Sequence, residues 1–396
     1  MGVFQFCRNH WKKLTFASVV AGYGANYVWT EHQITSHMQQ VCRSLPEIAS
    51  SRPYRAVVVI NPVANDKKCE KIFRKYCEPI LHLAGYSVEV VKTKEIGSAK
   101  SLIESLPALP DVLVIAGGDG TSSEVVTGLL RRKDEPCPIL LLPLGERNET
   151  VSAFLPVDSK KKVEYVKCLS SCVVSLVQER LRYRNVLKYE VLPDENDPEP
   201  HRPIYGLQRF SWGLVRDIEA KKNKYWYFGF LRHQASALAT SFSNEMSRNI
   251  TAMLTCTPPC PGCTKCAETK THTQRVFKKL FSPKTATPVA ALTVANDSCG
   301  LKEQHQVQAK QVDIVNVQNE KNFSELHTQV IESIDAGLDF IMHIKEKMEP
   351  SLLLKSRTVE IIPKDTDMPT YAIDGEEYDA RAVKISLLPN AIKCYC

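Results

Sequence analysis

The chain has 396 residues, of which 43% are hydrophobic and 24% charged, and these proportions are typical of globular proteins. A chain of this length holds about two domains, each with its own core. The net charge of +7 favours anionic partners. The sequence contains no RNA-recognition signature, finger or helix-turn-helix pattern, so no nucleic-acid partner is expected. Its fourteen cysteines are spread irregularly, which excludes a small disulfide scaffold.

The N-terminus has the character of a targeting or anchoring segment. Residues 1–30 contain no Asp or Glu, and a mostly apolar stretch, Leu14–Trp29, follows three basic residues. This stretch is slightly short for a membrane-spanning helix. Because no small-residue cleavage site follows it, we predict a retained membrane-associating segment rather than a secretory signal peptide. Residues 31–54 are polar and contain several serines, so we interpret them as a linker and place the segment and linker together at 1–53.

From Arg55 onward, apolar strand patterns alternate with helical ones. β-Branched and apolar runs predict buried strands at 56–60, 87–91, 112–116 and 139–142. Apolar spacing predicts helices over 66–84 and 98–106, and a third helix after residue 120. Such alternation indicates a parallel sheet with helices on both faces, and we assign this domain to residues 54–180. Its ligand is expected at the carboxyl ends of the strands. Four turns fall at such ends: Asn61, Thr93, Gly117–Thr121 and Pro143–Gly145.

The third of these turns reads GGDGTSSE and carries the strongest chemical signal. Gly117, Gly118 and Gly120 permit a close backbone approach, and the spacing Thr121–Glu124 predicts a capping box. A helix N-terminus at this point forms a natural phosphate site. Phosphates would repel Asp119 unless it holds a metal ion or accepts a proton from an attacking hydroxyl. The alternative is a tight turn whose Asp caps a helix. The glycine spacing matches neither a Walker P-loop nor a dinucleotide fingerprint.

After residue 181 the pattern becomes rich in strands. We predict a mainly β domain over 181–396, packed on the first domain. Its strands are expected at Arg182–Leu192, Pro203–Phe210, Asn249–Thr255, Thr287–Val294, Thr358–Ile362 and Ala382–Leu388. Asp374-Gly375 predicts a hairpin turn. Residues 294–350 show no pattern that assigns a structure to them, although 331–348 look partly helical.

Two features interrupt this second domain near residues 256–286. Cys256, Cys260, Cys263 and Cys266 form C-x3-C-x2-C-x2-C, which is compatible with zinc or an iron–sulfur cluster. The block lacks a second arm, so we predict a Pro-rich surface loop with free or oxidised thiols and no metal. Arg275–Lys284 is basic and aromatic. It fits a segment lying on an anionic bilayer, and it equally fits a packed helix with its lysines outward.

The string GGDGTSSEVVTGL resembles the nucleotide-binding signature of the diacylglycerol/sphingosine lipid kinases. Asn61-Pro62 resembles the first nucleotide-contacting turn of that family, and Thr93 with Gly97 and Ala99 resembles its Thr-x3-Gly-x-Ala element. The turn PLGERN resembles the family's PLGTxND, with Glu146 and Arg147 in place of small residues. The resemblance implies that ATP places its phosphates on Gly117–Thr121. It also implies nucleotide contacts at Asn61, Thr93 and Gly145.

The segment Phe210–Arg232 resembles the substrate motif of the same family. The resemblance implies that Asp217 or Glu219 binds the polar head of a lipid alcohol and that Arg232 neutralises the transferring phosphate. A solvated acidic pair and an exposed arginine are the alternative. The DGE turn near the C-terminus resembles one that places a carboxylate in the cleft. Here this residue is Glu376, which would assist Asp119 or help to order Mg²⁺.

The pattern as a whole is most similar to the mitochondrial acylglycerol kinases. This similarity implies a Rossmann-like parallel α/β nucleotide-binding domain followed by a mainly antiparallel β-sandwich, with the active site in the cleft between them. Asp119 would deprotonate the hydroxyl of a mono- or diacylglycerol, giving lysophosphatidic or phosphatidic acid with ATP and Mg²⁺. The family also implies the mitochondrial inner membrane, facing the intermembrane space, and a role beside subunits of the carrier translocase.

Three alternatives remain open. The chain could be a sphingosine or ceramide kinase, because the substrate motif is shared. It could also be a non-catalytic membrane scaffold with a kinase fold. NAD or phosphofructokinase-like chemistry on a soluble substrate fits the GGDGT string but does not explain the N-terminus.

Overall fold

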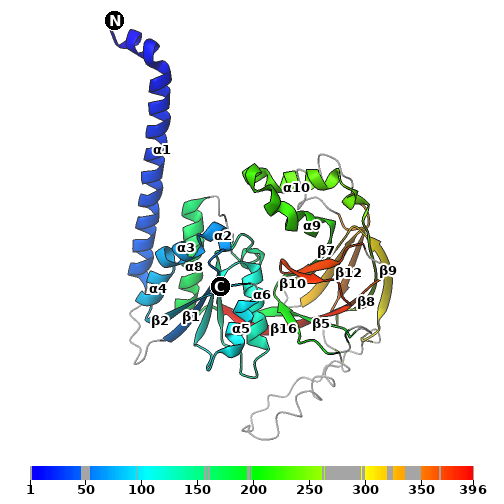
Figure 1. Ribbon diagram of the computed structural model, residues 1–396. Helices are drawn as coiled ribbons and strands as arrows, with labels where there is room; N and C mark the ends of the chain where they lie inside the picture. The colour runs from blue at the N-terminus through cyan, green and yellow to red at the C-terminus, as the bar shows by residue number, and fades with distance from the viewer. Residues whose placement is uncertain are drawn as a thin grey trace.

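The computed structural model shows two bodies side by side and a long N-terminal helix that projects from the first (Figure 1). It describes residues 2–45, 54–95, 97–155, 161–193, 199–260, 299–318, 324–334, 349–364 and 367–395, together with Asp158, Asp197, Cys263 and Asn296. The segment Arg275–Lys284 and the strand predicted over Thr287–Val294 lie outside these residues. So do Cys266 and most of the segment 331–348.

Helix α1 spans Gly2–Ser44. Its last part packs on the first body, where Ile34 is buried with Tyr76 and Val166 and the His37 ring hydrogen-bonds Ser170 Oγ at 2.8 Å. The linker predicted over 31–54 is therefore wrong for residues 31–44, which belong to α1. Apolar residues in this otherwise polar stretch pack against helices of the first body. Among the described residues, no helix has the length and apolar character needed to cross a membrane.

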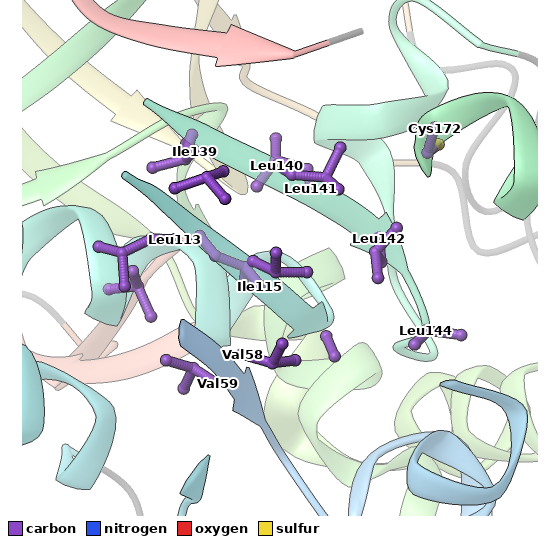
Figure 2. Close-up of a cluster of buried hydrophobic side chains, with 14 of the residues drawn as sticks. Val58, Val59, Leu113, Ile115, Ile139, Leu140, Leu141, Leu142, Leu144 and Cys172 are labelled. Carbon is purple, nitrogen blue, oxygen red and sulfur yellow. The ribbon is translucent and has the colours of Figure 1, made fainter. Parts of the chain in front are cut away.

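The first body contains a four-stranded parallel unit with the strand order β2-β1-β3-β4. Its strands are β1 (Tyr54–Ile60), β2 (Tyr86–Lys92), β3 (Val112–Gly117) and β4 (Ile139–Pro143). Side chains of β1, β3 and β4 form a closed apolar core, as predicted from their continuous apolar runs (Figure 2). Because these strands are buried on both faces, they lie in the middle of the sheet. The turns at their carboxyl ends are therefore supported by the core.

The helices that cover this unit follow the predicted order up to residue 130, with two corrections, and the helices over 149–152 and 162–177 were not predicted. They are α2 (Ala64–Lys67), α3 (Cys69–Tyr76), α4 (Glu78–Leu83), α5 (Ser98–Ser105), α6 (Asp119–Leu130), α7 (Glu149–Ser152) and α8 (Lys162–Val177). The helix predicted over 66–84 is divided into three. Lys67 has a φ of 65°, and α4 begins at Glu78 with Pro79, which has no N–H to donate, in its first turn. The capping box predicted at Thr121–Glu124 is also wrong, because α6 already begins at Asp119.

The second body is built from antiparallel strands, as predicted. They are β5 (Leu181–Val191), β6 (Ile204–Gly206), β7 (Arg209–Gly213), β8 (Ile250–Thr257), β9 (Glu303–Ala309), β10 (Gln311–Gln318), β11 (Ser324–Ile331), β12 (Leu352–Ser356), β13 (Thr358–Pro363), β14 (Thr370–Ile373), β15 (Glu376–Asp379) and β16 (Val383–Tyr395). One of its sheets has six strands in the order β12-β11-β10-β7-β14-β15. Strands β9, β10 and most of β11 occupy residues for which we predicted no structure.

Strand β16 joins the two bodies. It pairs antiparallel with β5 and β13, and its end then runs parallel to β4, with Cys394 opposite Ile139 and Tyr395 opposite Leu140. The parallel unit and part of the second body therefore form one ten-stranded sheet. Since the last residues of the chain complete the first sheet, the two bodies are held in a fixed relation across the space between them.

A helical arm leaves β7 and returns to β8. It consists of α9 (Leu214–Lys221), the 3-10 helix η1 (Lys222–Leu231), α10 (Arg232–Ser241) and η2 (Asn244–Ser247). Figure 1 shows α9 and α10 at the top of the second body. The arm contains most of the Phe210–Arg232 motif, so the predicted substrate segment is mainly helical.

Candidate functional site

A cleft of about 830 Å³ separates the parallel unit from the arm and from the β14–β15 hairpin. Predicted site residues from both bodies line it: Asn61, Thr93, Gly118, Asp119, Gly120, Thr121, Gly145, Glu219 and Glu376. Gly117 lies beneath Thr121 at the end of β3, and Arg232 reaches the rim through an ion pair with Glu146. The turns at the carboxyl ends of the parallel strands therefore meet at one site, as their positions in the sequence predicted.

Two glycine turns are packed directly against each other at the floor of the cleft. A Cβ atom at Gly145 would lie 2.2 Å from the Gly118 Cα atom and 2.5 Å from its nitrogen. Asn61 Nδ2 donates a hydrogen bond to Thr121 Oγ1 at 3.3 Å, which ties the β1 turn to the first turn of α6. This packing leaves the N-terminus of α6 facing the cleft, and a helix N-terminus there favours bound anions.

Asp119 is buried and bonded to a neighbouring helix. Its two carboxylate oxygens accept hydrogen bonds from the backbone nitrogens of Glu149, at 2.8 Å, and Thr150, at 3.0 Å. Asp119 thus caps the N-terminus of α7, and a helix-capping role was the alternative interpretation of this residue. Each carboxylate oxygen can accept more than one hydrogen bond. Asp119 also lines the cleft, so the cap leaves it able to meet a ligand there.

A pair of carboxyl groups, from Glu124 on α6 and Glu376 on β15, lines the same cleft. The pKa of Glu376 is raised well above its usual range, first by burial and then by the charge of Glu124 and a hydrogen bond with it. Glu124 is itself held by the backbone nitrogens of Gly97, at 2.7 Å, and Ala99, at 3.0 Å. The two carboxyl groups are therefore close enough to interact directly. From the sequence, we predicted that Glu376 lies in the cleft, but we assigned Glu124 only to a capping box.

The hairpin that carries Glu376 is anchored by a buried aspartate. Asp374 and Gly375 have φ angles of 47° and 88° and form the predicted two-residue turn. The Asp374 carboxylate accepts hydrogen bonds from the backbone nitrogens of Leu207, Gln208 and Arg209, at 2.6, 3.0 and 2.8 Å. Burial raises the pKa of Asp374 to about 6, although these bonds act in the opposite direction. Sequence reasoning missed this role because the bonded residues are distant in the chain.

The turn PLGERN reaches across the cleft through its two unusual residues. Glu146 forms an ion pair with Lys222 Nζ at 2.9 Å and another with Arg232. Arg147 Nη1 lies 3.2 Å from Glu219 Oε2, and Arg147 Nη2 donates to the Gly375 carbonyl oxygen at 3.3 Å. Both predicted polar contacts of the arm, Glu219 and Arg232, are thus engaged by this turn.

Asp217 behaves differently from Glu219. It forms an ion pair with Arg216 at 2.7 Å, and Arg216 continues to Glu377 at 2.9 Å. Glu219, in contrast, lines both the cleft and a smaller adjoining cavity of about 80 Å³. Of the two acidic residues left open by the sequence, Glu219 is therefore the one that lines the cleft.

Replacing Arg147 by alanine is expected to loosen the arm with little loss of global stability. The variant loses the ion pair to Glu219 and the bond to Gly375, but Arg147 is partly exposed. A double-mutant cycle with Glu219→Gln should give a coupling energy of about 0.2–1 kcal/mol in chemical unfolding. Limited proteolysis should cut residues 214–241 faster in Arg147→Ala than in the native chain. A coupling energy of zero, with equal cleavage rates, would contradict the bridge.

Comparisons with known proteins find related kinases. The family model "Diacylglycerol kinase catalytic domain" matches residues 55–177, and the model "Acylglycerol kinase C-terminal" matches residues 205–396. The chain is 28% identical to "Acylglycerol kinase, mitochondrial" of Xenopus laevis over 100% of this chain and 94% of that protein. It is 29% identical to the Homo sapiens protein of the same name over 99% of this chain and 96% of that one.

A solved structure shows the same fold. The structure of a putative diacylglycerol kinase from Bacillus anthracis aligns with a TM-score of 0.53 at 15% sequence identity. The alignment covers 88% of this chain and 97% of that chain. The predicted arrangement of a parallel α/β domain and an antiparallel β domain with a cleft between them is thereby confirmed.

Proposed function

The chain belongs to the lipid kinases that carry a diacylglycerol kinase catalytic domain, and from this premise we propose that it transfers the γ-phosphoryl group of ATP to the hydroxyl of a mono- or diacylglycerol. The products would be lysophosphatidic acid and phosphatidic acid. Both halves of the chain match acylglycerol kinases, and the match extends over the full length. This favours acylglycerols over the sphingoid lipids that the shared substrate motif also allows.

The observation that carries the proposal is the position of Asp119 between two cavities. Asp119 lines the large cleft, which has the helix N-terminus and the glycine turns suited to a triphosphate. It also lines the smaller cavity, whose other walls include Arg147, Arg209 and Glu219. A group with access to both cavities can contact a phosphoryl donor on one side and an alcohol on the other.

The roles of the side chains follow from this arrangement. Asp119, fixed by the two backbone N–H groups of α7, accepts the proton of the attacking hydroxyl as its oxygen bonds to the γ-phosphorus. The bond from the γ-phosphorus to the bridging oxygen of ATP breaks, and ADP leaves. Glu219 accepts a hydrogen bond from the second free hydroxyl of a monoacylglycerol, a group that a diacylglycerol does not have. Lys222, which lines the cleft, and Arg232 are both paired with Glu146, and they stabilise negative charge on the transferring group.

The carboxyl pair fits a divalent cation. Glu124 and Glu376 are close enough to interact directly, and both line the cleft, so their carboxylate oxygens can bind one divalent cation together. Mg²⁺ prefers carboxylate oxygens and usually takes one or two of them beside phosphate oxygens. These two residues would hold it, and Mg²⁺ would supply neutralisation of phosphate charge.

Apolar surface next to the cleft supports a lipid substrate. Trp226, Tyr227 and Phe228 on η1 are 74%, 62% and 48% exposed, and Phe242 after α10 is 86% exposed. Lys222 and Asn223, at the start of the same helix, line the cleft. Aromatic side chains of this kind settle at membrane–water interfaces. The patch would place the cleft at the level of the lipid head groups.

Helix α1 supports attachment to the same membrane. Its described side chains between Trp11 and Trp29 include exposed aromatic and branched residues. The full-length relatives are named mitochondrial, which supports a mitochondrial location. Within the mitochondrion, we propose the inner membrane, with the protein facing the intermembrane space. A second role, as a scaffold beside subunits of the carrier translocase, is compatible with the same anchoring.

The test is transfer of label from radioactive ATP in mixed micelles. The acceptors are monoacylglycerol, diacylglycerol, sphingosine and ceramide, each with Mg²⁺ and with EDTA. We expect label on the two acylglycerols, lost with EDTA. Label only on sphingoid lipids would move the substrate class. No label from folded, ATP-binding protein would leave the scaffold role as the function.

A further inference from the structure

Three cysteines meet at the outer edge of the second body, away from the cleft. The sulfur atoms of Cys260, Cys263 and Cys299 all lie within 4.8 Å of one another. Cys263 is fully buried, and the other two are partly buried. None of the three lines the cleft, so the cluster is independent of the proposed phosphoryl transfer.

The register of strands β8 and β9 brings two of these cysteines together. Their ladder runs from Ile250 opposite Ala309 to Cys256 opposite Glu303. Continuing the same antiparallel register by four residues on each strand places Cys260 opposite Cys299. The dipeptide Pro261-Gly262 is a turn signal, and Cys263 follows it. The hairpin thus supplies a C-x2-C step on one arm and a cysteine on the other.

Cys299 is the opposing ligand that the block Cys256–Cys266 lacks on its own. The spacing of Cys256 to Cys266 alone predicted a metal-free loop, because a block of eleven residues offers no opposing ligand. Cys299 lies thirty-six positions after Cys263, beyond the segment Arg275–Lys284, and its relation to the block depends on strand pairing.

The surroundings of the cluster suit thiolates. Asn296 Nδ2 donates a hydrogen bond to Cys260 Sγ at 3.4 Å. Such donors to ligand sulfurs are typical of the outer shell of metal sites, where they orient the ligand and disperse its charge. Thiolates select soft or borderline metals over Mg²⁺ or Ca²⁺.

We propose that Cys260, Cys263 and Cys299 bind a structural Zn²⁺ ion. Structural zinc sites are built from four ligands with a preference for cysteine, and the described residues supply three. A bound ion would fix the open end of the β8–β9 hairpin and clamp the two ends of the segment 264–298. Closing a long loop in this way stabilises the folded state.

The test measures metal in the purified full chain. Protein prepared without chelators should contain one zinc ion per chain, as measured by elemental mass spectrometry. Cys263→Ser and Cys299→Ser should each lose most of it. The matched control is Cys256→Ala. Cys256 lies on β8, four positions before Cys260, and is not part of the cluster. Burial raises the pKa of its thiol to about 11. The control should keep its zinc.

A second measurement does not depend on how the variants fold. Wild-type protein reconstituted with Co²⁺ should show the visible bands of a tetrahedral cobalt thiolate site. X-ray absorption of the zinc form should show sulfur at about 2.3 Å. Reduced wild-type protein that takes up neither metal would overturn the proposal. So would zinc retained in full by both serine variants, or a disulfide between two of the three cysteines.

Discussion

Asparagine in place of Asp119 is expected to lower the rate of phosphoryl transfer by roughly 10²–10⁴-fold, the contribution typical of a positioned proton acceptor. Asparagine keeps one oxygen but replaces the other with an amide that donates. One of the two backbone N–H groups of α7 then faces a donor instead of an acceptor. The measurement is kcat at saturating ATP and acylglycerol, together with the melting temperature of each protein.

A control variant distinguishes a catalytic role of Asp119 from a purely structural one. Asp111 also accepts a backbone N–H, from Arg55 at 2.7 Å, and it does not line the cleft. Asp111→Asn should therefore lower the melting temperature slightly and leave kcat unchanged. If the loss in Asp119→Asn follows the unfolded fraction and vanishes at low temperature, Asp119 only supports α7. The assignment of a proton acceptor would then be wrong.

The parallel unit was predictable because its strands are buried on both faces. The runs at 56–60, 112–116 and 139–142 are continuous and apolar, and few structures other than a central strand bury such a run. The ligand edge followed from chain direction, since every parallel strand ends at the same side. In contrast, β9 reads EQHQVQA, and only its last residues alternate between buried and exposed. A strand at the edge of a sheet leaves little apolar signal.

The contacts that shape the site could not be read from the sequence because they join distant residues. Asp374 bonds the backbone of residues 207–209, and Arg147 bonds Glu219 and Gly375. Each looks locally like a turn residue. The return of β16 to β4 likewise depends on pairing between residue 139 and residue 394. Residue types indicated where a ligand belongs, but the three-dimensional structure was needed to show which side chains face it.

The fit between Gly145 and Gly118 leads to the second large effect. Gly145→Ala is expected to abolish measurable ATP binding and to lower the free energy of unfolding. Its Cβ atom would lie 2.2 Å from the Gly118 Cα atom and 3.1 Å from the Gly117 carbonyl carbon. Both neighbours are backbone atoms in the turn that faces the phosphates, so they cannot rotate aside. Overpacking typically costs about 1–3 kcal/mol, and we expect the upper end here.

Two comparisons decide whether this close approach is the cause. Gly24→Ala adds a Cβ atom that meets nothing within 4 Å, so its ATP affinity and melting temperature should equal those of the native chain. Gly120→Ala would bring a Cβ atom to 3.0 Å from Glu376 Oε1, the end of a flexible side chain, and should fold normally. Calorimetric titration with ATP and thermal unfolding give both quantities. Native affinity in Gly145→Ala would mean that the two turns separate without consequence, and the interlocked floor would then play no part in holding the nucleotide.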